Sequence, residues 1–450
     1  MICFIKKEKR SKVMIQKLNT LFNGLHTFII LWATQGFSAL GSSMTSYALV
    51  IWAYQQERSA LASSLLTVCS YAPYVLLSIF AGALSDRWNK KLTMLVCDSF
   101  AALCTLSVLA LLATGRLELW HLYVVNALSG LGNTLQQPAS DVAVSLLTPR
   151  EQYQKAAGMR AFSNSLVTIL APVFATALLS ALGIYAVIAF DLLTFTAAFL
   201  CLVFFVKIPE RDLSKGSEGQ SSVLVAAGQG LRYLGENRGI LDLILFLASI
   251  NLVASVYNAA LPAMLLSRNG GSQGALALVS ACTGLANVAG SAIATFLPAP
   301  RSRVRAICLS LLFAMSTENF LLALGRSTPV WCLGAVLGWL FIPVMNTNMD
   351  ALFRTHIPLE MQGRVYSARN TLQFFTIPVG YLLGGVLVDR VFEPFMAGQD
   401  RGSIPSILFG TGKGSGAAFL FFVIAFAGIL VCLYFQRDRH IWELEGKRND

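Results

Sequence analysis

Charged side chains are scarce in this chain. Asp, Glu, Lys and Arg make up 13% of its 450 residues, and hydrophobic residues make up 55%. Soluble domains carry about 25% charged residues, and the shortage here extends along the whole chain. This composition excludes a soluble globular protein. Short segments of alternating polarity are also missing, which excludes an outer-membrane β-barrel.

Catalytic and metal-binding motifs are missing as well. The nine cysteines are scattered, without a Cys-x-x-Cys pair or the spacing of metal ligands. No nucleotide-binding motif with a phosphate-binding lysine is present, which excludes ATP drive within this chain. We therefore expect no enzyme, no catalytic residues, no metal and no cofactor. The four histidines all lie at the ends of apolar runs or in the tail: His26, His121, His356 and His440.

Long apolar runs are what the chain does have. A membrane-spanning helix needs about 20 mostly apolar residues, and about twelve runs reach that length. We predict an all-α polytopic membrane protein with twelve transmembrane helices. The predicted spans lie near residues 25–54, 60–84, 92–113, 119–147, 160–182, 184–206, 240–267, 273–298, 304–325, 329–352, 366–391 and 415–435.

Basic residues are distributed unevenly around these spans. If both termini are cytoplasmic, only seven of the 34 Lys and Arg face the other side: Arg58, Arg116, Arg268, Arg326, Arg390, Arg401 and Lys413. Cytoplasmic loops of membrane proteins carry the excess of Lys and Arg, so both termini are predicted to be cytoplasmic. The same asymmetry explains the net charge of +11. We expect the lipid bilayer, and no nucleic acid, as a partner.

One long polar stretch separates the first six spans from the last six. We predict a cytoplasmic basic N-terminus, an N-terminal six-helix bundle, a cytoplasmic linker, a C-terminal six-helix bundle and a cytoplasmic tail. Their boundaries are 1–24, 25–206, 207–238, 239–436 and 437–450.

The two halves share a pattern at a constant offset of 209 residues. Asp141 corresponds to Asp350, Pro149 to Pro358, Glu151 to Glu360, Lys155 to Arg364 and Arg160 to Arg369. Each set lies at the end of one span and the beginning of the next. Five matches at the same topological place indicate an internal repeat of six spans, as in transporters built around a central cavity.

The turn between the second and third spans reads Gly82-Ala83-Leu84-Ser85-Asp86-Arg87-Trp88-Asn89-Lys90-Lys91. It is similar to the Gly-x-Leu-Ala-Asp-Arg-x-Gly-Arg-Lys signature of the major facilitator superfamily, with Asn89 in place of a Gly. Three further stretches resemble the branch that includes macrolide-type drug efflux proteins: 147–151, 362–365 and 377–394. Two positions depart from the drug antiporters, because Asn126 replaces an Arg and Ala171-Pro172 replaces Gly-Pro.

This resemblance implies two six-helix pseudo-repeats around a central cavity in a monomer of the bacterial cell (inner) membrane. It also implies a gating latch on the cytoplasmic side, in which Asp141 faces Arg87 and the second half repeats the placement. The alternative is a solvated turn that only enforces topology. The predicted latch residues are Gly82, Asp86, Arg87, Lys90, Lys91, Asp141, Asp350 and Arg354.

Three carboxylates lie deep within predicted spans, namely Asp98, Asp191 and Glu318. A carboxyl group in an apolar surrounding can bind and release protons near neutral pH, so these residues are candidates for proton coupling. In the fold that the resemblance implies, spans 3, 6 and 9 are peripheral. Pairing with loop residues or reaching to the interface is therefore the alternative.

Polar and aromatic residues occur in the middle of spans 1, 4, 7 and 10, which line the cavity in this fold. Amides in lipid need partners or water, so they are expected to face inward, with hydrogen bonding between helices as the alternative. Because these four spans lack a central Lys or Arg, we predict an uncharged cavity. The candidates are Gln35, Ser38, Asn126, Asn133, Gln136, Asn251, Tyr257, Asn258, Trp339 and Asn346.

These features predict a secondary active transporter that exports small amphipathic molecules, in the manner of drug efflux, by alternating access. A proton is the expected coupling ion. Export of an endogenous metabolite such as a siderophore or peptide, or import, is the alternative within this class. A membrane-embedded enzyme or a channel is the alternative from other classes.

Overall fold

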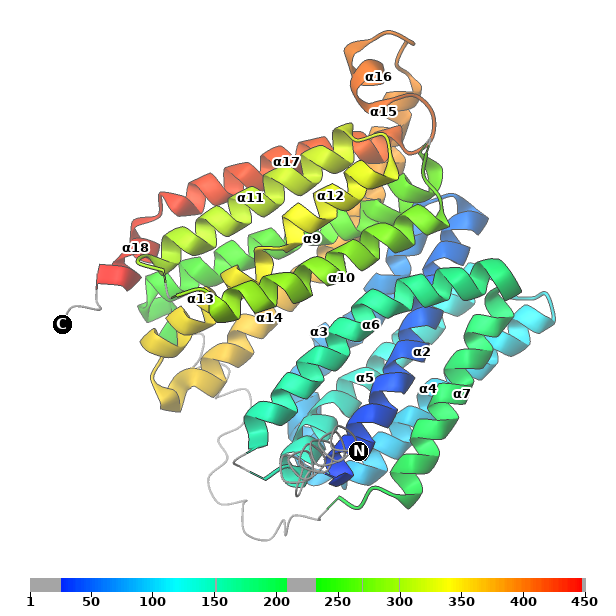
Figure 1. Ribbon diagram of the computed structural model, residues 1–450, viewed down its shortest axis with the longest axis vertical. Helices are drawn as coiled ribbons and strands as arrows, with labels where there is room; N and C mark the ends of the chain where they lie inside the picture. The colour runs from blue at the N-terminus through cyan, green and yellow to red at the C-terminus, as the bar shows by residue number, and fades with distance from the viewer. Residues whose placement is uncertain (1–25, 150–151, 209–231, 269, 299, 447–450) are drawn as a thin grey trace, which may run out of the picture.

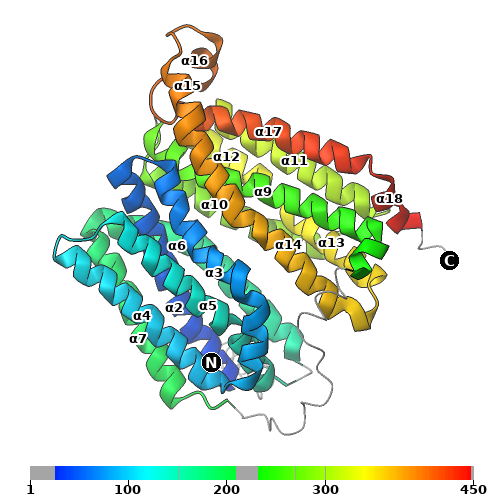
Figure 2. The same cartoon turned by 180° about the vertical axis from the view of Figure 1, so that it is seen from behind.

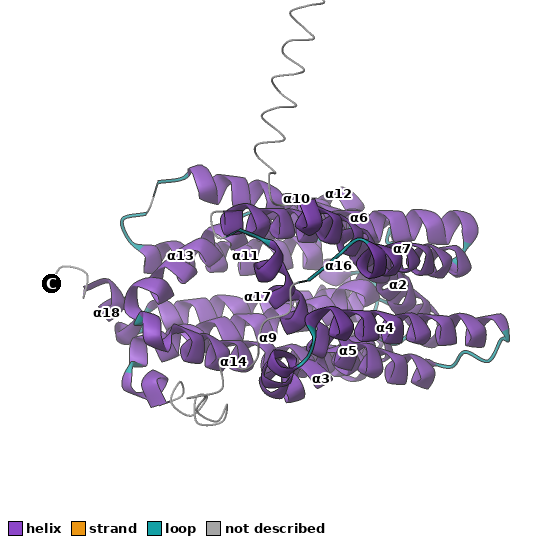
Figure 3. Cartoon of the chain, turned by 90° about the horizontal axis from the view of Figure 1, so that it is seen from below, coloured by secondary structure: helices purple, strands orange, loops and turns teal. Residues whose placement is uncertain are grey.

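The computed structural model describes residues 26–149, 152–208, 232–268, 270–298 and 300–446. The predicted N-terminus and most of the predicted linker lie outside these ranges, and so do the side chains of residues 78–87. The described residues form helices joined by short loops, and no strand occurs among them (Figure 3).

The first half of the chain contributes six long helices. They are α2 (His26–Glu57), α3 (Ala60–Arg87), α4 (Lys90–Ala113), α5 (Leu119–Leu147), α6 (Tyr153–Leu182) and α7 (Ile184–Phe204). Within this bundle α3 packs on α5, α2 packs on α6 and α7, and α4 packs on α5.

The second half begins at α9 and contains several interrupted helices. Its elements are α9 (Arg238–Ser267), α10 (Gln273–Phe296), α11 (Arg303–Leu324), α12 (Thr328–Trp339), α13 (Ile342–His356), α14 (Leu359–Val386), η3 (Leu387–Phe392), α15 (Glu393–Ala397), α16 (Ile404–Phe409), α17 (Ser415–Gln436) and α18 (Arg439–Gly446). Here α14 and α17 pack on α9, and α11 packs on α12 and α17.

The two bundles lie side by side, as Figures 1 and 2 show from opposite directions. Most of the packing between them comes from two helix pairs, α3 on α14 and α6 on α10. We call the end that carries the starts of α2 and α9 and the end of α7 the linker face, and the opposite end the far face.

Ten helical segments among the described residues are long and apolar enough to cross a membrane. The segments α12–α13 and α14–α15 each count as one of them. The other two long helices, α2 and α5, have 32 and 29 residues but are more polar. The twelve-span count therefore rests on assigning α2 and α5 to the membrane too, which their packing inside the bundle supports.

The helix of predicted span 10 is broken into α12 and α13. Pro343 stands at the start of α13, where its ring and its missing N–H cannot continue the preceding helix. The carbonyl of Leu340 at the break lies against Gly290 of α10, where a Cβ atom would overlap it. The break is therefore stabilised by a close approach that only glycine permits at this position.

Glycines of α14 serve two interfaces. Side chains at Gly380 and Gly384 would collide with Ser255 and Ala259 of α9, inside the second half. The neighbouring Gly385 lies against the backbone of Leu61, which belongs to α3 in the first half. The stretch therefore allows α14 to approach both bundles closely, as a Gly-x-x-x-Gly face does in membranes.

The predicted tail forms α18, which folds back on the second half. Ile441 and Leu444 are buried, and Glu445 Oε1 accepts a hydrogen bond of 2.8 Å from the Val304 backbone N–H at the start of α11. A carboxylate at a helix N-terminus satisfies an otherwise unpaired donor and interacts favourably with the helix dipole. The tail is thus a packed part of the second bundle.

Candidate functional site

A cavity of about 690 Å³ lies against the first bundle and reaches the second. The helix α2 contributes the largest share of its wall, and α4, α5, α7, α9 and α10 contribute smaller parts. The lining residues are Gln35, Ser38, Ala39, Ser42, Ser43, Ser46, Tyr47, Val50, Ile51, Asp98, Ala101, Asn133, Gln136, Phe195, Asn258, Leu261, Pro262, Leu276 and Ser280. A cavity shared by two bundles is a typical binding site of a transporter.

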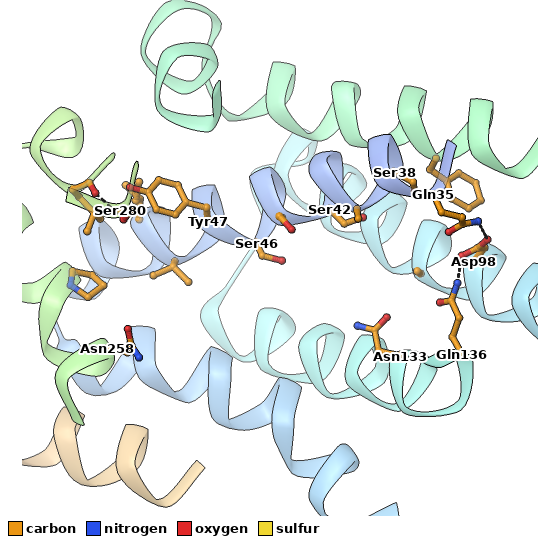
Figure 4. A pocket seen from close by; sticks show the side chains of 18 of the residues that line it. Gln35, Ser38, Ser42, Ser46, Tyr47, Asp98, Asn133, Gln136, Asn258 and Ser280 are labelled. Carbon is orange, nitrogen blue, oxygen red and sulfur yellow. Dashed lines mark hydrogen bonds between the residues drawn. The ribbon is translucent and has the colours of Figure 1, made fainter. Parts of the chain in front are cut away.

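A row of hydroxyl groups runs along the cavity on α2. Ser38, Ser42 and Ser46 are four residues apart, so they lie on one face of the helix. Figure 4 shows this row between Asp98 at one end and Tyr47, Asn258 and Ser280 at the other. The row also explains why α2 is more polar than an ordinary lipid-facing helix.

A second pocket of about 520 Å³ adjoins the cavity. Asn133 and Gln136 line both spaces. The second pocket lies between α3, α5, α6 and α14 and extends to Arg160, about two turns from the linker-face start of α6. Tyr74 and Phe374 also line it and meet across the two halves, with ring centroids 5.4 Å apart.

Asp98 of α4 projects into the cavity, where two amides hold it (Figure 4). Gln136 Nε2 donates to Oδ1 at 2.6 Å, and Gln35 Nε2 donates to Oδ2 at 3.3 Å. The prediction of an uncharged cavity holds for Lys and Arg, which do not occur among the described lining residues, but it missed this ionisable carboxyl group. It considered only spans 1, 4, 7 and 10, whereas the packing of α4 on α5 brings this carboxylate to the wall.

Half of the predicted cavity residues line the cavity: Gln35, Ser38, Asn133, Gln136 and Asn258. The other half line neither pocket: Asn126, Asn251, Tyr257, Trp339 and Asn346. Asn126 donates to the Leu122 carbonyl of its own helix, and Tyr257 is buried in the core of the second bundle. The serines of α2 beyond Ser38 went unpredicted, although their four-residue spacing was a readable signal.

Asp191 of α7 is buried behind the cavity wall and is connected to the cavity by one hydrogen bond. Its Oδ1 accepts from Ser42 Oγ at 2.9 Å, and Ser42 itself lines the cavity. Its side chain is 4% exposed. Gly41 of α2 permits the close approach of α7 here, because a Cβ atom at Gly41 would overlap Thr194 Oγ1 and lie 2.9 Å from the Cα atom of Asp191. This carboxylate is therefore linked to the cavity through α2.

Glu318 of α11 is buried in the second bundle, beside the break between α12 and α13. Trp339 Nε1, at the end of α12, donates to Glu318 Oε1 at 3.0 Å. Gly338 provides the space, since a Cβ atom there would overlap the carboxylate. Glu318 lines neither pocket, so any coupling through it must act by way of its neighbours, Trp339 of α12 and Tyr257 of α9.

The predicted latch residues are spread along the linker face. The side chains of Asp86 and Arg87, and the surroundings of Gly82, lie outside the described part. Lys91 Nζ donates to the carbonyls of Val203 and Val206 at the end of α7, and Lys90 Nζ donates to the Trp88 carbonyl. Arg354 is exposed in the last turn of α13.

Both halves carry the same ion pair at their linker-face ends. Asp141 pairs with Arg160 at 2.6 Å, and Asp350 pairs with Arg369 at 3.4 Å. These four residues correspond in pairs at the repeat offset of 209. Each pair joins two consecutive long helices of one half, and all four side chains are partly exposed. The repeat in sequence is therefore also a repeat of contacts.

Hydrogen bonds join the two halves at the far face. Asp389, inside the π-helix η3, accepts from Ser59 Oγ at 2.6 Å and from the backbone N–H groups of Ala60 and Leu61 at 3.0 and 2.9 Å. A carboxylate of the second half thus caps the first turn of α3 in the first half. Tyr54 Oη also lies 2.5 Å from Ser267 Oγ, and Lys413 Nζ donates to the Arg58 carbonyl.

Comparisons with known proteins agree with this architecture. The chain is 25% identical to macrolide efflux protein A of Streptococcus pyogenes over 371 residues, which cover 81% of this chain and 90% of that protein. It is 23% identical to the multidrug efflux pump Tap of Mycolicibacterium fortuitum over 363 residues, which cover 78% and 86%. These identities indicate distant relatives.

Solved structures share the fold. A mutant of the nucleoside transporter NupG matches with a TM-score of 0.68 and 14% identity, over 92% of this chain and 100% of that one. A bacterial homologue of the lysosomal transporter Spinster, inward-facing and occupied, matches with a TM-score of 0.65 and 14% identity, over 94% and 97%.

The family model described as Major Facilitator Superfamily matches residues 31–381. Because this match covers more than half of the chain, the protein belongs to the major facilitator superfamily.

Proposed function

We propose that this protein is a secondary active transporter that exports small amphipathic molecules by alternating access, in antiport with protons. The observation that carries the proposal is the cavity shared by two repeated bundles, with hydroxyl and amide groups along one wall and apolar residues along another. Such a wall suits amphipathic ligands. The distant efflux relatives support this direction of transport.

The excess of Lys and Arg supports assigning the linker face to the cytoplasm. With that orientation, the second pocket extends the cavity toward the cytoplasm, and the Asp389 cap closes the extracellular side. We infer an inward-facing conformation that is ready to take up substrate from the cytoplasm or the inner leaflet. Export then requires the Asp389 contacts to open and the linker face to close.

The experiment that tests export uses an efflux-deficient bacterial host that expresses the full chain. We expect lowered susceptibility to some members of a panel of antibiotics and dyes, and energy-dependent extrusion of a fluorescent member. An uncoupler should abolish that extrusion. If a sodium gradient sustains extrusion without a proton gradient, the proton assignment is wrong. If no compound on the panel is extruded while a metabolite or peptide is, the drug-efflux assignment is wrong.

We assign proton coupling first to Asp191 among Asp98, Asp191 and Glu318. Asp191 contacts the cavity through Ser42 and is otherwise buried, so substrate binding at Ser42 can change its surroundings directly. A carboxylate in an apolar surrounding strongly resists carrying a charge without a partner. Movement of α2 against α7 changes the surroundings of Asp191 and can therefore make this side chain take up or release a proton.

We predict that Asp191→Asn keeps substrate exchange but loses most proton-driven accumulation in everted vesicles. The reason is that a carboxamide fills the same space and can still bond to Ser42, yet cannot carry a proton across the cycle. Counterflow and proton-driven uptake are measured side by side. Glu318→Gln is the comparison variant. If Glu318→Gln loses accumulation while Asp191→Asn keeps it, coupling lies in the second bundle instead.

We propose that the latch residues close the linker face when the far face opens. The pairs Asp141–Arg160 and Asp350–Arg369 stand where such a closure would exchange partners. Exposed ion pairs contribute little to stability, about 0–1 kcal/mol. Their repetition in both halves therefore supports a role in the transport cycle.

Removing either member of the first pair is expected to slow export a few-fold. We predict that Asp141→Ala and Arg160→Ala each lower the initial extrusion rate, and that the double variant is no slower than either one. Substrate binding and thermal stability should change little. Additive losses in the double variant would show that the two side chains act separately, which contradicts the latch proposal for this pair.

A further inference from the structure

The carboxylate of Asp98 stands where the cavity and the second pocket meet. Gln136, which donates to it at 2.6 Å, lines both spaces. The hydrogen bond between these side chains therefore lies on the shared wall. A ligand that enters from the second pocket passes Gln136 before it reaches the serines of α2, with Asp98 on its way (Figure 4).

Asp98 is the charged member of the cavity wall, since no Lys or Arg occurs among the lining residues that the structure describes. Its partners are amides, one from Gln35 of α2 and one from Gln136 of α5. From α7, Phe195 contributes an apolar ring to the cavity wall. When this group is ionised its two oxygens can accept about four hydrogen bonds, and the two amides supply only part of that number.

Apolar residues form the cavity wall beyond the serine row. Val50 and Ile51 of α2, Leu261 and Pro262 of α9, and Leu276 of α10 line the cavity toward the far face. The site is therefore polarised, with a negative charge at one end, hydroxyls along one side and apolar surface at the other end. This distribution specifies the charge and the shape of its ligand.

We propose that the cavity selects organic monocations, with the cationic group at Asp98 and an apolar body against the far-face wall. The proposal rests on the proposed transport function and adds the substrate charge to it. A protonated amine or a quaternary ammonium or phosphonium group supplies the positive charge that the wall lacks. An anion meets a carboxylate that no Lys or Arg of the described lining offsets and is rejected, because like charges repel.

The ligand takes the place of an amide at the carboxylate. Because Gln136 donates the shorter bond and faces both spaces, we assign to it the exchange with the incoming cation. Asp98 is thus the residue that determines charge specificity, and Gln136 is its competitor. Two variants then have opposite effects: loss of Asp98 weakens cation binding, whereas loss of the Gln136 amide strengthens it.

The test measures binding to the purified full chain in lipid nanodiscs. Tetraphenylphosphonium and tetraphenylborate have the same shape and opposite charge, and triphenylphosphine oxide is a neutral relative. We expect the wild type to bind the cation at least ten-fold more tightly than the anion. Asp98→Asn should lower the affinity for the cation at least ten-fold and leave the affinity for the neutral compound unchanged. Asp98→Glu should retain most of the wild-type affinity for the cation.

Gln136→Ala separates ligand recognition from a merely structural role. It should raise affinity for tetraphenylphosphonium several-fold, whereas a loss of cavity structure would lower affinity for all three compounds. Equal cation binding by the wild type and Asp98→Asn overturns the proposal, and so does anion binding as tight as cation binding. If Asp98→Asn does not fold, a fall in cation affinity in Gln136→Ala overturns it by itself.

Transport separates failure of this inference from failure of the proposed function. Extrusion of neutral compounds without extrusion of tetraphenylphosphonium leaves the exporter proposal intact and overturns the cation inference. Tight, Asp98-dependent binding of the cation without any extrusion supports the inference and counts against the exporter.

Discussion

Replacing Asp389 with alanine is expected to shift this protein strongly toward a conformation that is open at the far face. The carboxylate accepts three hydrogen bonds from the start of α3, across the boundary between the halves. Hydrogen bonds to a charged group contribute about 1.5–3 kcal/mol each. Even a total of about 3 kcal/mol would change the ratio of the two conformations about 100-fold.

Opening at this place does not leave α3 uncapped. Ser59 Oγ also accepts from the Ala62 N–H at 3.0 Å, so the helix keeps a cap of its own when Asp389 withdraws. The six-residue π-helix η3 shifts the helical register at Asp389, and such bulges often mark functional positions. The hydrogen bonds of Asp389 therefore stabilise one conformation strongly, while the remaining Ser59 cap keeps the free-energy cost of breaking them small.

Cysteine accessibility measures this shift. In a cysteine-free background, Ser280→Cys places a thiol on the cavity wall near the far face. A membrane-impermeant maleimide added from outside should label it slowly in the parent and at least ten-fold faster with Asp389→Ala, while export falls. Asp400→Asn, which changes an exposed carboxylate in the loop between α15 and α16, is the control. Unchanged labelling with Asp389→Ala would refute the closing role.

Replacing Gly130 with alanine is expected to be the most damaging small substitution in the first bundle. A Cβ atom at this position of α5 would overlap the backbone carbonyl of Ser70 in α3. The two helices would have to separate along one of the closest contacts of the bundle. Overpacking of this kind costs about 1–3 kcal/mol, and more when the neighbour is backbone.

Gly132, two residues further along the same helix, is the matched control. A Cβ atom there would lie 3.7 Å from a ring carbon of Phe100, an ordinary van der Waals distance. Gly132→Ala should be neutral or slightly stabilising, since alanine favours a helix by about 1 kcal/mol over glycine. Thermal unfolding in detergent should give a much lower midpoint for Gly130→Ala alone. Equal midpoints would contradict the close packing of α3 on α5.

The apolar runs predicted most of the fold because a span is a local property. About 20 apolar residues in a row satisfy the membrane wherever they lie in the chain. Span 10 shows the limit of that argument, since one apolar run became α12 and α13 around a break. Pro343 signalled the interruption, but the neighbouring Gly290 on α10 that accommodates it belongs to a different part of the sequence.

The candidate site was predicted only in part, because lining a cavity depends on which face of a helix meets its neighbours. Gln35 and Gln136 face the cavity, whereas Asn126 lies on the same helix as Gln136 and bonds to its own backbone. Residue type alone could not separate them. Asp98 was placed at the periphery by its span number, yet its side chain reaches between two cavity helices.

The sequence by itself determined the all-helical membrane architecture, the division into halves and the repeated charges at positions 141, 160, 350 and 369. These features depend on hydropathy, spacing and internal similarity, which follow from the order of residues along the chain. Tertiary structure alone decided that Asp98 lies on the cavity wall, that Asp389 bonds to the start of α3 across the two halves and that Glu445 caps α11. Each of these contacts joins segments far apart in the chain, and their partners are chosen by packing geometry.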